Sequence, residues 1–167
     1  CEELLTRYRH DQRIMMISGD NYQFGKQHTS SSYYFSRYCH IWGWASWRRA
    51  WKLYDVDMEM WPSVKDGRLL RDILQHRNVI KFWVNAFDRV YTKQIDTWDF
   101  QFTFASWINS TLCIMPTVNL ISNIGFGYEA TNTINENELS RMPVFEMKFP
   151  LEHPHMIIRD AIADRIT

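Results

Sequence analysis

The chain of 167 residues is long enough for one domain with a sizeable core, and 46% hydrophobic and 23% charged residues are ordinary proportions for a folded soluble protein. Nineteen basic and nineteen acidic residues leave no net charge, and no Lys/Arg block breaks that balance, so the charge pattern of a nucleic-acid-binding protein is absent. No apolar run reaches the roughly 18 residues that a membrane span needs.

Aromatic residues and cysteines narrow the possibilities further. Aromatic residues make up 16% of the chain, which favours a large core or a site that stacks on flat ligand faces, such as the CH-rich face of a sugar. The three cysteines, Cys1, Cys39 and Cys113, are widely spaced and odd in number, which indicates neither a disulfide framework nor a zinc site. A reducing compartment fits this pattern best, and we expect a cytoplasmic protein.

The N-terminal part of the chain is typical of helix, strand, loop and strand. Glu2 to His10 has the apolar spacing of an amphipathic helix. Arg13 to Ser18 is a short apolar run bounded by turn residues, which predicts a buried parallel strand, and ligands of open α/β sheets gather at the carboxyl ends of such strands. Gly19 to Ser32 is a polar loop for which we expect mobility, and Tyr33 to Tyr38 has strand character.

The segment HIWGWASWRRAWKLYD holds four of the eight tryptophans around one glycine. Trp44, Trp47 and Trp51 recur at i, i+3 and i+7, so on a helix that ends near Tyr54 they form one apolar stripe. For Trp47 and Trp51 this pattern predicts core positions.

Trp42 and Gly43 lie just ahead of this expected helix. A glycine lets the backbone approach a neighbour or a ligand closely, and an indole can serve as a wall. Trp42 and Trp44 therefore have two open interpretations, as core residues or as the lining of a ligand site. His40 and His28 could bind a ligand or transfer a proton, although isolated histidines in aromatic surroundings are more often structural.

The remaining sequence predicts helices, short strands and one long loop. Helices are expected at Asp66 to Gln75, Asn78 to Tyr91, Thr97 to Trp107 and His155 to Arg165. Short strands are expected at Thr111 to Met115, Asn119 to Ile124 and Phe145 to Phe149, with a polar loop from Gly125 to Ser140.

The stretch QIDTWDFQFTF contains two carboxylates at the start of a predicted helix, with Asp96 just outside it and Asp99 in its first turn. A carboxylate there is stabilised by the helix dipole and by free backbone N–H groups, which keep it ionised and able to accept a proton. Plain capping explains the same residues, so both interpretations stay open. The chain lacks GxSxG, HExxH, CxxC and P-loop motifs.

Three strings, YFSRYCHIWGWASWRRAWKLYD, DTWDFQFTF and CIMPTVNLISNIGFG, resemble the carboxyl-terminal half of a group of bacterial proteins. These proteins are usually labelled family 2-like glycosyltransferases or nucleotide-diphospho-sugar transferases, and sometimes carry an older haemolysin-like name. The resemblance covers most of the chain. A shorter likeness, Trp98-Asp99 followed by Cys113-Ile114-x-Pro116, is to the acceptor half of N-acetylglucosaminyltransferase I.

The resemblance implies an α/β fold of the GT-A type, with a mixed sheet and several flanking helices. Residues 1–167 would be a single partial domain, the acceptor-side half, with the nucleotide-binding half missing, so we expect an exposed sheet edge beside Arg13 to Ser18 and no activity from this half alone. Such enzymes move a sugar from a nucleotide-sugar donor to a glycan acceptor. In inverting members a carboxylate deprotonates the acceptor hydroxyl, and a divalent cation, Mn or Mg, stabilises the leaving diphosphate. Asp99 is then the expected base and Asp96 the second candidate, while the ligands of the cation would lie mostly outside this chain.

The expected substrate-binding residues are Trp42, Gly43, Trp44, His40, Asn123 and Gly125. Family members are expected to carry a histidine in the loop after NIGFG, where this chain has Asn132, whose amide binds metal more weakly and cannot titrate. The alternative functions are a non-catalytic carbohydrate-binding or interaction module and, less well supported, a glycosidase. A location at the surface of the bacterial inner membrane is the alternative to a free cytoplasmic enzyme.

Overall fold

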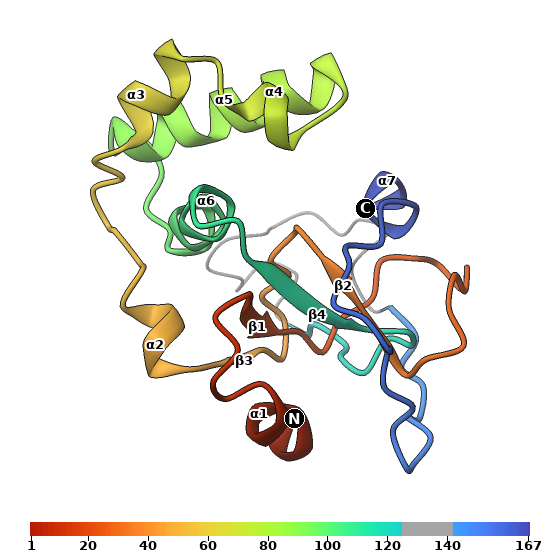
Figure 1. Cartoon of the computed structure of the whole chain (residues 1–167). Helices are drawn as coiled ribbons and strands as arrows, with labels where there is room; N and C mark the ends of the chain where they lie inside the picture. The colour runs from red at the N-terminus through yellow and green to blue at the C-terminus, as the bar shows by residue number, and fades with distance from the viewer. Residues whose placement is uncertain (125–141) are drawn as a thin grey trace.

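The computed structural model describes residues 1–124 and 142–167, which form an α/β structure on a four-stranded mixed sheet (Figure 1). The order in the sheet is β2-β4-β1-β3, with β1 at Ile14–Ile17, β2 at Tyr33–Ser36, β3 at Ala45–Ser46 and β4 at Leu112–Pro116. The middle strands β1 and β4 run parallel, and each edge strand is antiparallel to its neighbour. The predicted α/β class and mixed sheet are confirmed, and the GT-A type stays a prediction.

The strand β1 is central because its residues are apolar on both faces. All of Ile14–Ile17 is buried, as expected for a strand that is covered on both sides. It pairs with β4 on one side and with β3 on the other, so the open sheet edge expected beside Arg13 to Ser18 does not exist. The two-residue strand β3 occupies that position.

Seven helices surround the sheet in the described part of the chain (Figure 1). They are α1 (Glu2–Arg7), α2 (Arg48–Trp51), α3 (Trp61–Asp66), α4 (Leu70–Ile73), α5 (Arg77–Tyr91), α6 (Asp99–Ile108) and α7 (Ala163–Ile166). The helix α6 lies between the sheet and the group formed by α3, α4 and α5, while α1 packs on the opposite face of the sheet. None of the described helices has the length and apolar composition needed to cross a bilayer.

The helix α6 is the central support of the molecule. Its residues Gln101 to Trp107 are all buried, and an all-round buried helix is typical of a core position. Phe102 and Ala105 pack on the sheet, whereas Phe104 and Trp107 pack on the α3–α5 group. The start of α6 is therefore held firmly between two layers.

The long helix expected from Trp44 to Tyr54 is wrong. Ala45 and Ser46 pair with β1 instead, and the Ser46 hydroxyl donates to the Met15 carbonyl at 2.7 Å. Hydrogen bonding to a buried strand outweighs the local helical spacing, so the helix begins only at Arg48. As a consequence, the three tryptophans of the expected stripe do not share one helix face.

Other expected elements are shorter or absent. Asn119 to Ile124 and Phe145 to Phe149 contain no strand, and the two segments are joined by a single backbone bond from the Phe145 N–H to the Asn119 carbonyl. The helix expected at Asp66 to Gln75 is reduced to α4, and the one at His155 to Arg165 to α7. In the latter, Arg159 forms an isolated parallel bridge with Phe35, which keeps the backbone extended. The expected loop from Gly125 to Ser140, with Asn132, lies outside the described residues.

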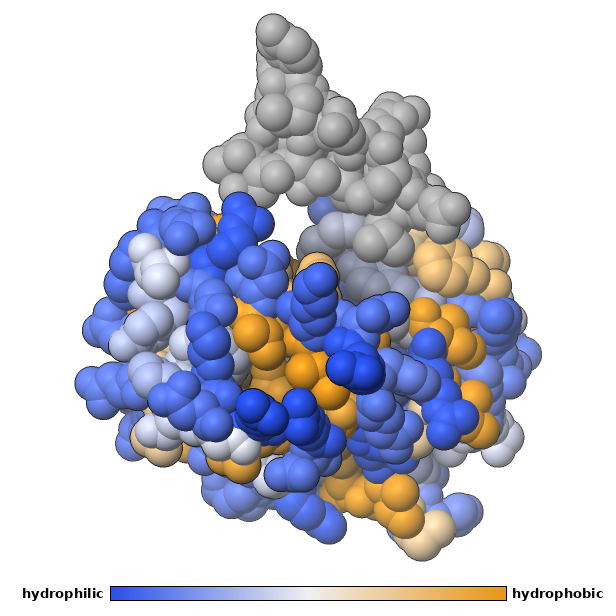
Figure 2. Space-filling view, turned by 90° about the horizontal axis from the view of Figure 1, so that it is seen from above, coloured by the Kyte–Doolittle hydropathy of each residue, from blue (hydrophilic) through white to orange (hydrophobic). Residues whose placement is uncertain are grey.

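The face on the side of the α3–α5 group is mostly hydrophilic, with apolar areas between polar side chains (Figure 2). The exposed apolar residues of this group include Leu69, Phe82 and Tyr91. Isolated exposed apolar residues are normal on protein surfaces, so their exposure alone does not indicate a binding site.

Candidate functional site

Four aromatic side chains gather beside the start of α6, and we call Trp44, Trp51, Tyr54 and Trp98 the aromatic ledge. The ring centroids of Trp44 and Trp98 lie 4.8 Å apart, although the two residues are far apart in sequence. The rings of Trp51 and Tyr54 are also 4.8 Å apart and nearly parallel, with an interplanar angle of 4°. The structure thus joins the tryptophan segment to the predicted Asp99 motif.

The ledge is partly open to solvent. Trp44 is 37% exposed and Trp51 is 44% exposed, while the Phe102 ring beneath them is fully buried. The expected core position of Trp51 is therefore wrong, because the residue that α2 buries is Ala50, and the neighbouring Trp51 is left partly in solvent. Burying apolar surface stabilises a fold by roughly 25 cal/mol per Å², and two indoles left partly in water do not contribute this stabilisation in full. Two exposed indoles side by side therefore favour a binding role over a purely structural one.

Trp47 lies apart from the ledge. Its indole is half-buried against the α1 side of the sheet, and its N–H donates to the Leu5 carbonyl at 3.0 Å. The Arg49 guanidinium lies over its ring, 4.5 Å from the centroid. Trp47 is thus a packing residue at the margin of the core, so its expected core position is met only in part.

Asp99 is the first residue of α6 and directly follows Trp98 of the ledge. Its Oδ1 accepts hydrogen bonds from the Thr97 hydroxyl and, at 3.0 Å, from the Phe100 backbone N–H. Within residues 1–124 and 142–167 its Oδ2 accepts no hydrogen bond. One oxygen of this half-buried carboxylate is therefore anchored, and the other is available to a ligand.

Asp96 and Asp99 both lie close enough to the ledge to affect the pKa of the Tyr54 hydroxyl. Burial raises the pKa of Tyr54, and the negative charges of Asp55, Asp99 and Asp96 raise it further. Asp96 is exposed and precedes the helix, whereas Asp99 is half-buried within it. This difference favours Asp99 as the better oriented of the two predicted acids.

A second cluster forms at the carboxyl end of β1 around the fully buried Asp20. Its carboxylate accepts hydrogen bonds from the Ser18 hydroxyl at 2.7 Å, from the Tyr22 hydroxyl at 3.0 Å and from Nδ1 of His40 at 3.1 Å. Asp20 and Tyr22 were not expected from the sequence, although Asp20 follows a buried strand at the end where ligands gather. These bonds hold the expected mobile loop from Gly19 to Ser32 at its start.

His40 has one nitrogen engaged and one without a partner. Because a carboxylate only accepts, the bond to Asp20 places the proton on Nδ1. The Tyr22 ring stacks on the imidazole at 4.4 Å between centroids, and burial raises the pKa of Tyr22, with Asp20 adding to the shift. Nε2 of His40 is buried and has no hydrogen-bond partner among the described residues. His40 is therefore positioned rather than free to rotate.

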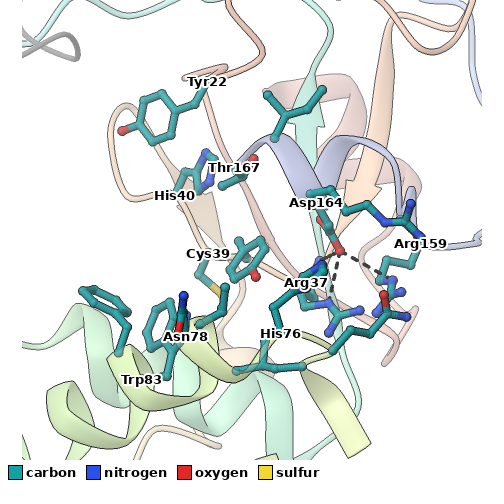
Figure 3. A pocket seen from close by; sticks show the side chains of 18 residues that line it. Tyr22, Arg37, Cys39, His40, His76, Asn78, Trp83, Arg159, Asp164 and Thr167 are labelled. Atoms are coloured by element: carbon teal, nitrogen blue, oxygen red, sulfur yellow. Dashed lines mark hydrogen bonds and ion pairs between the residues drawn. The ribbon is translucent and has the colours of Figure 1, made fainter. Parts of the chain in front are cut away.

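His40 also lines a cavity of about 600 Å³, shown in Figure 3. At its other end Arg37 and Arg159 point toward Asp164, with N–O distances of 3.2 and 3.5 Å. Burial raises the pKa of Asp164, and the Ser36 hydroxyl and Arg37 oppose that shift. Both arginines are thus engaged with this carboxylate.

A smaller cavity of about 440 Å³ lies at the carboxyl ends of β1 and β4, lined among others by Gly19, Gly43, Pro116 and Ile121. A Cβ added to Gly43 would lie 2.4 Å from the Ile121 side chain, and the φ angle of Gly43 is +61°. Gly43 therefore makes room for Ile121, a neighbour in the fold. Its predicted role of admitting a ligand is not needed to explain the glycine.

The remaining predicted site residues are divided between these places. Trp42 is half-buried with its ring edge against Tyr22 at 5.7 Å, so it belongs to the Asp20 cluster and not to the ledge. Asn123 is half-buried in the segment after β4, and Gly125 lies outside the described residues. Within 1–124 and 142–167 no group of three or more His, Cys, Asp or Glu side chains could hold a metal, and the expected divalent cation stays a prediction.

The geometry thus brings together an exposed aromatic surface and a carboxylate with an available oxygen. Comparisons with family models, with curated proteins and with solved structures found no match for this chain.

Proposed function

We propose that this chain provides the acceptor side of a glycosyltransferase, with a glycan on the aromatic ledge and Asp99 as the base. The observation that carries the proposal is the start of α6, where exposed indoles adjoin a carboxylate that has one anchored oxygen. Indole faces suit the CH-rich faces of sugar rings, and a carboxylate accepts hydrogen bonds from their hydroxyls. The resemblance of the strings around Trp44 and Asp99 to family 2-like glycosyltransferases supports the same function.

Asp99 would act on the hydroxyl of the acceptor sugar. The Thr97 hydroxyl and the Phe100 N–H hold Oδ1, and the helix dipole stabilises the negative charge. Oδ2 then accepts the proton as the hydroxyl oxygen attacks the anomeric carbon of the donor. The aromatic ledge orients the acceptor and excludes water from one side of it. In such enzymes a divalent cation neutralises the leaving diphosphate, and we assign no described residue to it.

The test compares two substitutions in the intact protein. Asp99→Asn keeps the shape of the side chain but removes the proton acceptor, so transfer should fall by roughly 10²–10⁴. The measurement is nucleoside diphosphate release from a panel of nucleotide sugars in the presence of an oligosaccharide panel. Asp96→Asn, in an exposed position three residues earlier, is the matched control and should leave the rate almost unchanged.

The second candidate is a carbohydrate-binding module without catalysis, because the ledge alone suffices to hold a sugar. Trp44→Ala should weaken oligosaccharide binding under either function, as measured by tryptophan fluorescence titration. Phe82→Ala should not, because this exposed ring in α5 packs on Trp83 and is not part of the ledge. Binding with no transfer by the intact protein would favour the module. Unchanged transfer in Asp99→Asn would remove Asp99 as the base.

A further inference from the structure

Two cysteines that are 74 residues apart in the sequence meet beside the sheet. Cys39 follows β2, and Cys113 lies in β4, which is hydrogen-bonded to β2 in antiparallel register. Their Sγ atoms are 3.0 Å apart, and neither thiol is part of a disulfide. The wide spacing of the cysteines in the sequence did not indicate this pair.

The two thiols differ in access. Cys113 is fully buried in the middle strand β4, and burial raises the pKa of its thiol. Cys39 is only partly buried and lines the cavity of about 600 Å³, where Figure 3 shows it in the middle of the lining residues. A small reagent in this cavity therefore meets Cys39 and not Cys113.

The separation of the sulfurs argues against a shared metal. Two thiolates bound to one zinc ion at roughly 2.3 Å each would lie about 3.8 Å apart at a tetrahedral angle. The observed 3.0 Å is shorter than that and requires an approach of only about 1 Å to reach the S–S bond length of roughly 2.05 Å. Cys39 lies outside the sheet and can make this movement, while Cys113 is fixed in β4.

We infer that Cys39 and Cys113 are a reversible oxidation site, at which hydrogen peroxide converts the two thiols into an intramolecular disulfide. Each peroxide takes two electrons and two hydrogens from the pair and yields two waters. Cytosolic disulfides of this kind are typically transient, so the proposal agrees with the expected reducing compartment.

The chemistry proceeds in two steps. The Cys39 thiolate attacks one peroxide oxygen, the O–O bond breaks, and the departing hydroxide takes up a proton to become water, leaving Cys39 as a sulfenic acid. The Cys113 sulfur then loses its proton and attacks the Cys39 sulfur. The S–S bond forms, the S–O bond breaks, and the hydroxyl leaves with a proton as the second water.

The experiment uses the folded chain, reduced with dithiothreitol and then treated with hydrogen peroxide. The remaining thiols are alkylated with N-ethylmaleimide after unfolding, and the products are analysed by intact mass and peptide mapping. We expect a monomer with one alkylated thiol, Cys1, and one linked peptide pair containing Cys39 and Cys113, which dithiothreitol separates again. Complete alkylation of all three cysteines, or a mixture of all three possible pairings in the folded chain, would overturn the proposal.

Single substitutions test the order of the steps. In Cys113→Ser the reaction should stop at a Cys39 sulfenic acid, which dimedone traps, and in Cys39→Ser the buried Cys113 should stay reduced in the folded chain. Oxidation of Cys113 in folded Cys39→Ser would contradict the assigned roles. Cys1→Ser is the control and should form the same disulfide. If the Cys113 variant does not fold, the pairing pattern of the unmodified chain still decides the question.

Discussion

At the scale of single residues, Gly43 and Gly25 show why the same residue type has different roles. Both have positive φ angles, +61° for Gly43 and +82° for Gly25, which residues with a Cβ rarely adopt. A Cβ at Gly43 would collide with Ile121, whereas a Cβ at Gly25 would meet nothing within 4 Å. Only Gly43 is therefore required by packing as well as by backbone conformation.

We expect Gly43→Ala to destabilise the fold by roughly 2–4 kcal/mol, because backbone strain and overpacking act together. Gly25→Ala has the strain alone and should cost about 1 kcal/mol. Urea unfolding of both variants measures the difference. Adding Ile121→Ala should recover part of the loss in Gly43→Ala and none in Gly25→Ala. Equal losses in the two glycine variants would contradict the packing argument.

The buried Asp164 gives a pH prediction. Burial raises its pKa above the ordinary value of 3.8 despite the Ser36 hydroxyl and Arg37. The folded chain thus binds this proton more tightly than the unfolded chain, and the resulting stability is fully present below pH 3.8 and is lost as the pH rises through the raised pKa.

The amide of Asp164→Asn does not titrate, so the stability of this variant should not change through this group. As the pH rises from 3.8 through the raised pKa, the free energy of unfolding of the variant should therefore increase relative to that of the unmodified chain. Urea titrations at several pH values measure this difference. If the variant instead becomes relatively less stable with rising pH, the attraction to Arg37 outweighs burial, and the argument from burial is wrong.

At the scale of elements, the fold separates the tryptophans into supports and surfaces. Trp61 in α3 is 1% exposed, packs on Phe87 and Phe104, and donates from its indole to Asp88 at 3.0 Å. Trp51 at the end of α2 belongs to the aromatic ledge. The two residues are chemically identical. Trp61 is a core residue because α3 buries it, whereas α2 leaves Trp51 partly exposed.

Trp61→Ala should therefore lower the free energy of unfolding by roughly 3–5 kcal/mol, the cost of a large cavity. Trp51→Ala should cost at most about 2 kcal/mol, because much of that side chain is already in water. Denaturant unfolding measures the stabilities, and fluorescence titration measures oligosaccharide binding. The proposed function requires that Trp51→Ala weaken binding. A larger stability loss for Trp51→Ala than for Trp61→Ala would show that Trp51 is a core residue and not part of a binding surface.

At the scale of the whole molecule, the inferred disulfide would close a long loop across the sheet. The linked residues are 74 positions apart, and the loop contains the ledge tryptophans, α2 to α6 and most of the helical layer. In the chain-entropy model a loop of this length stabilises the fold by about 4 kcal/mol through its effect on the unfolded chain.

The peroxide-treated chain should thus unfold at a higher urea concentration than the reduced chain, and dithiothreitol should reverse the difference. Cys1→Ser should show the same shift, and Cys39→Ser should show none. Lower stability in the oxidised chain would mean that closing the S–S bond strains β4 more than the loop closure stabilises the fold.

The sequence alone predicted those elements whose pattern is local. The apolar run of β1, the strand character of β2 and β4, and the helical periodicity of α5 and α6 were all placed correctly within a few residues. It also identified Asp99 as the acid at the start of α6, because a helix start has a recognisable local composition. The same local periodicity led to the wrong helix from Trp44 to Tyr54.

Tertiary structure decided everything that depends on partners distant in sequence. Pairing with β1 converted Ala45 and Ser46 into a strand, and packing against α6 turned Trp44 and Trp98 into neighbours. The Asp20–His40 bond and the Cys39–Cys113 pair likewise join residues from separate elements. Spacing along the chain carries no information on such contacts, because the backbone path between the partners, and not their own propensity, brings them together.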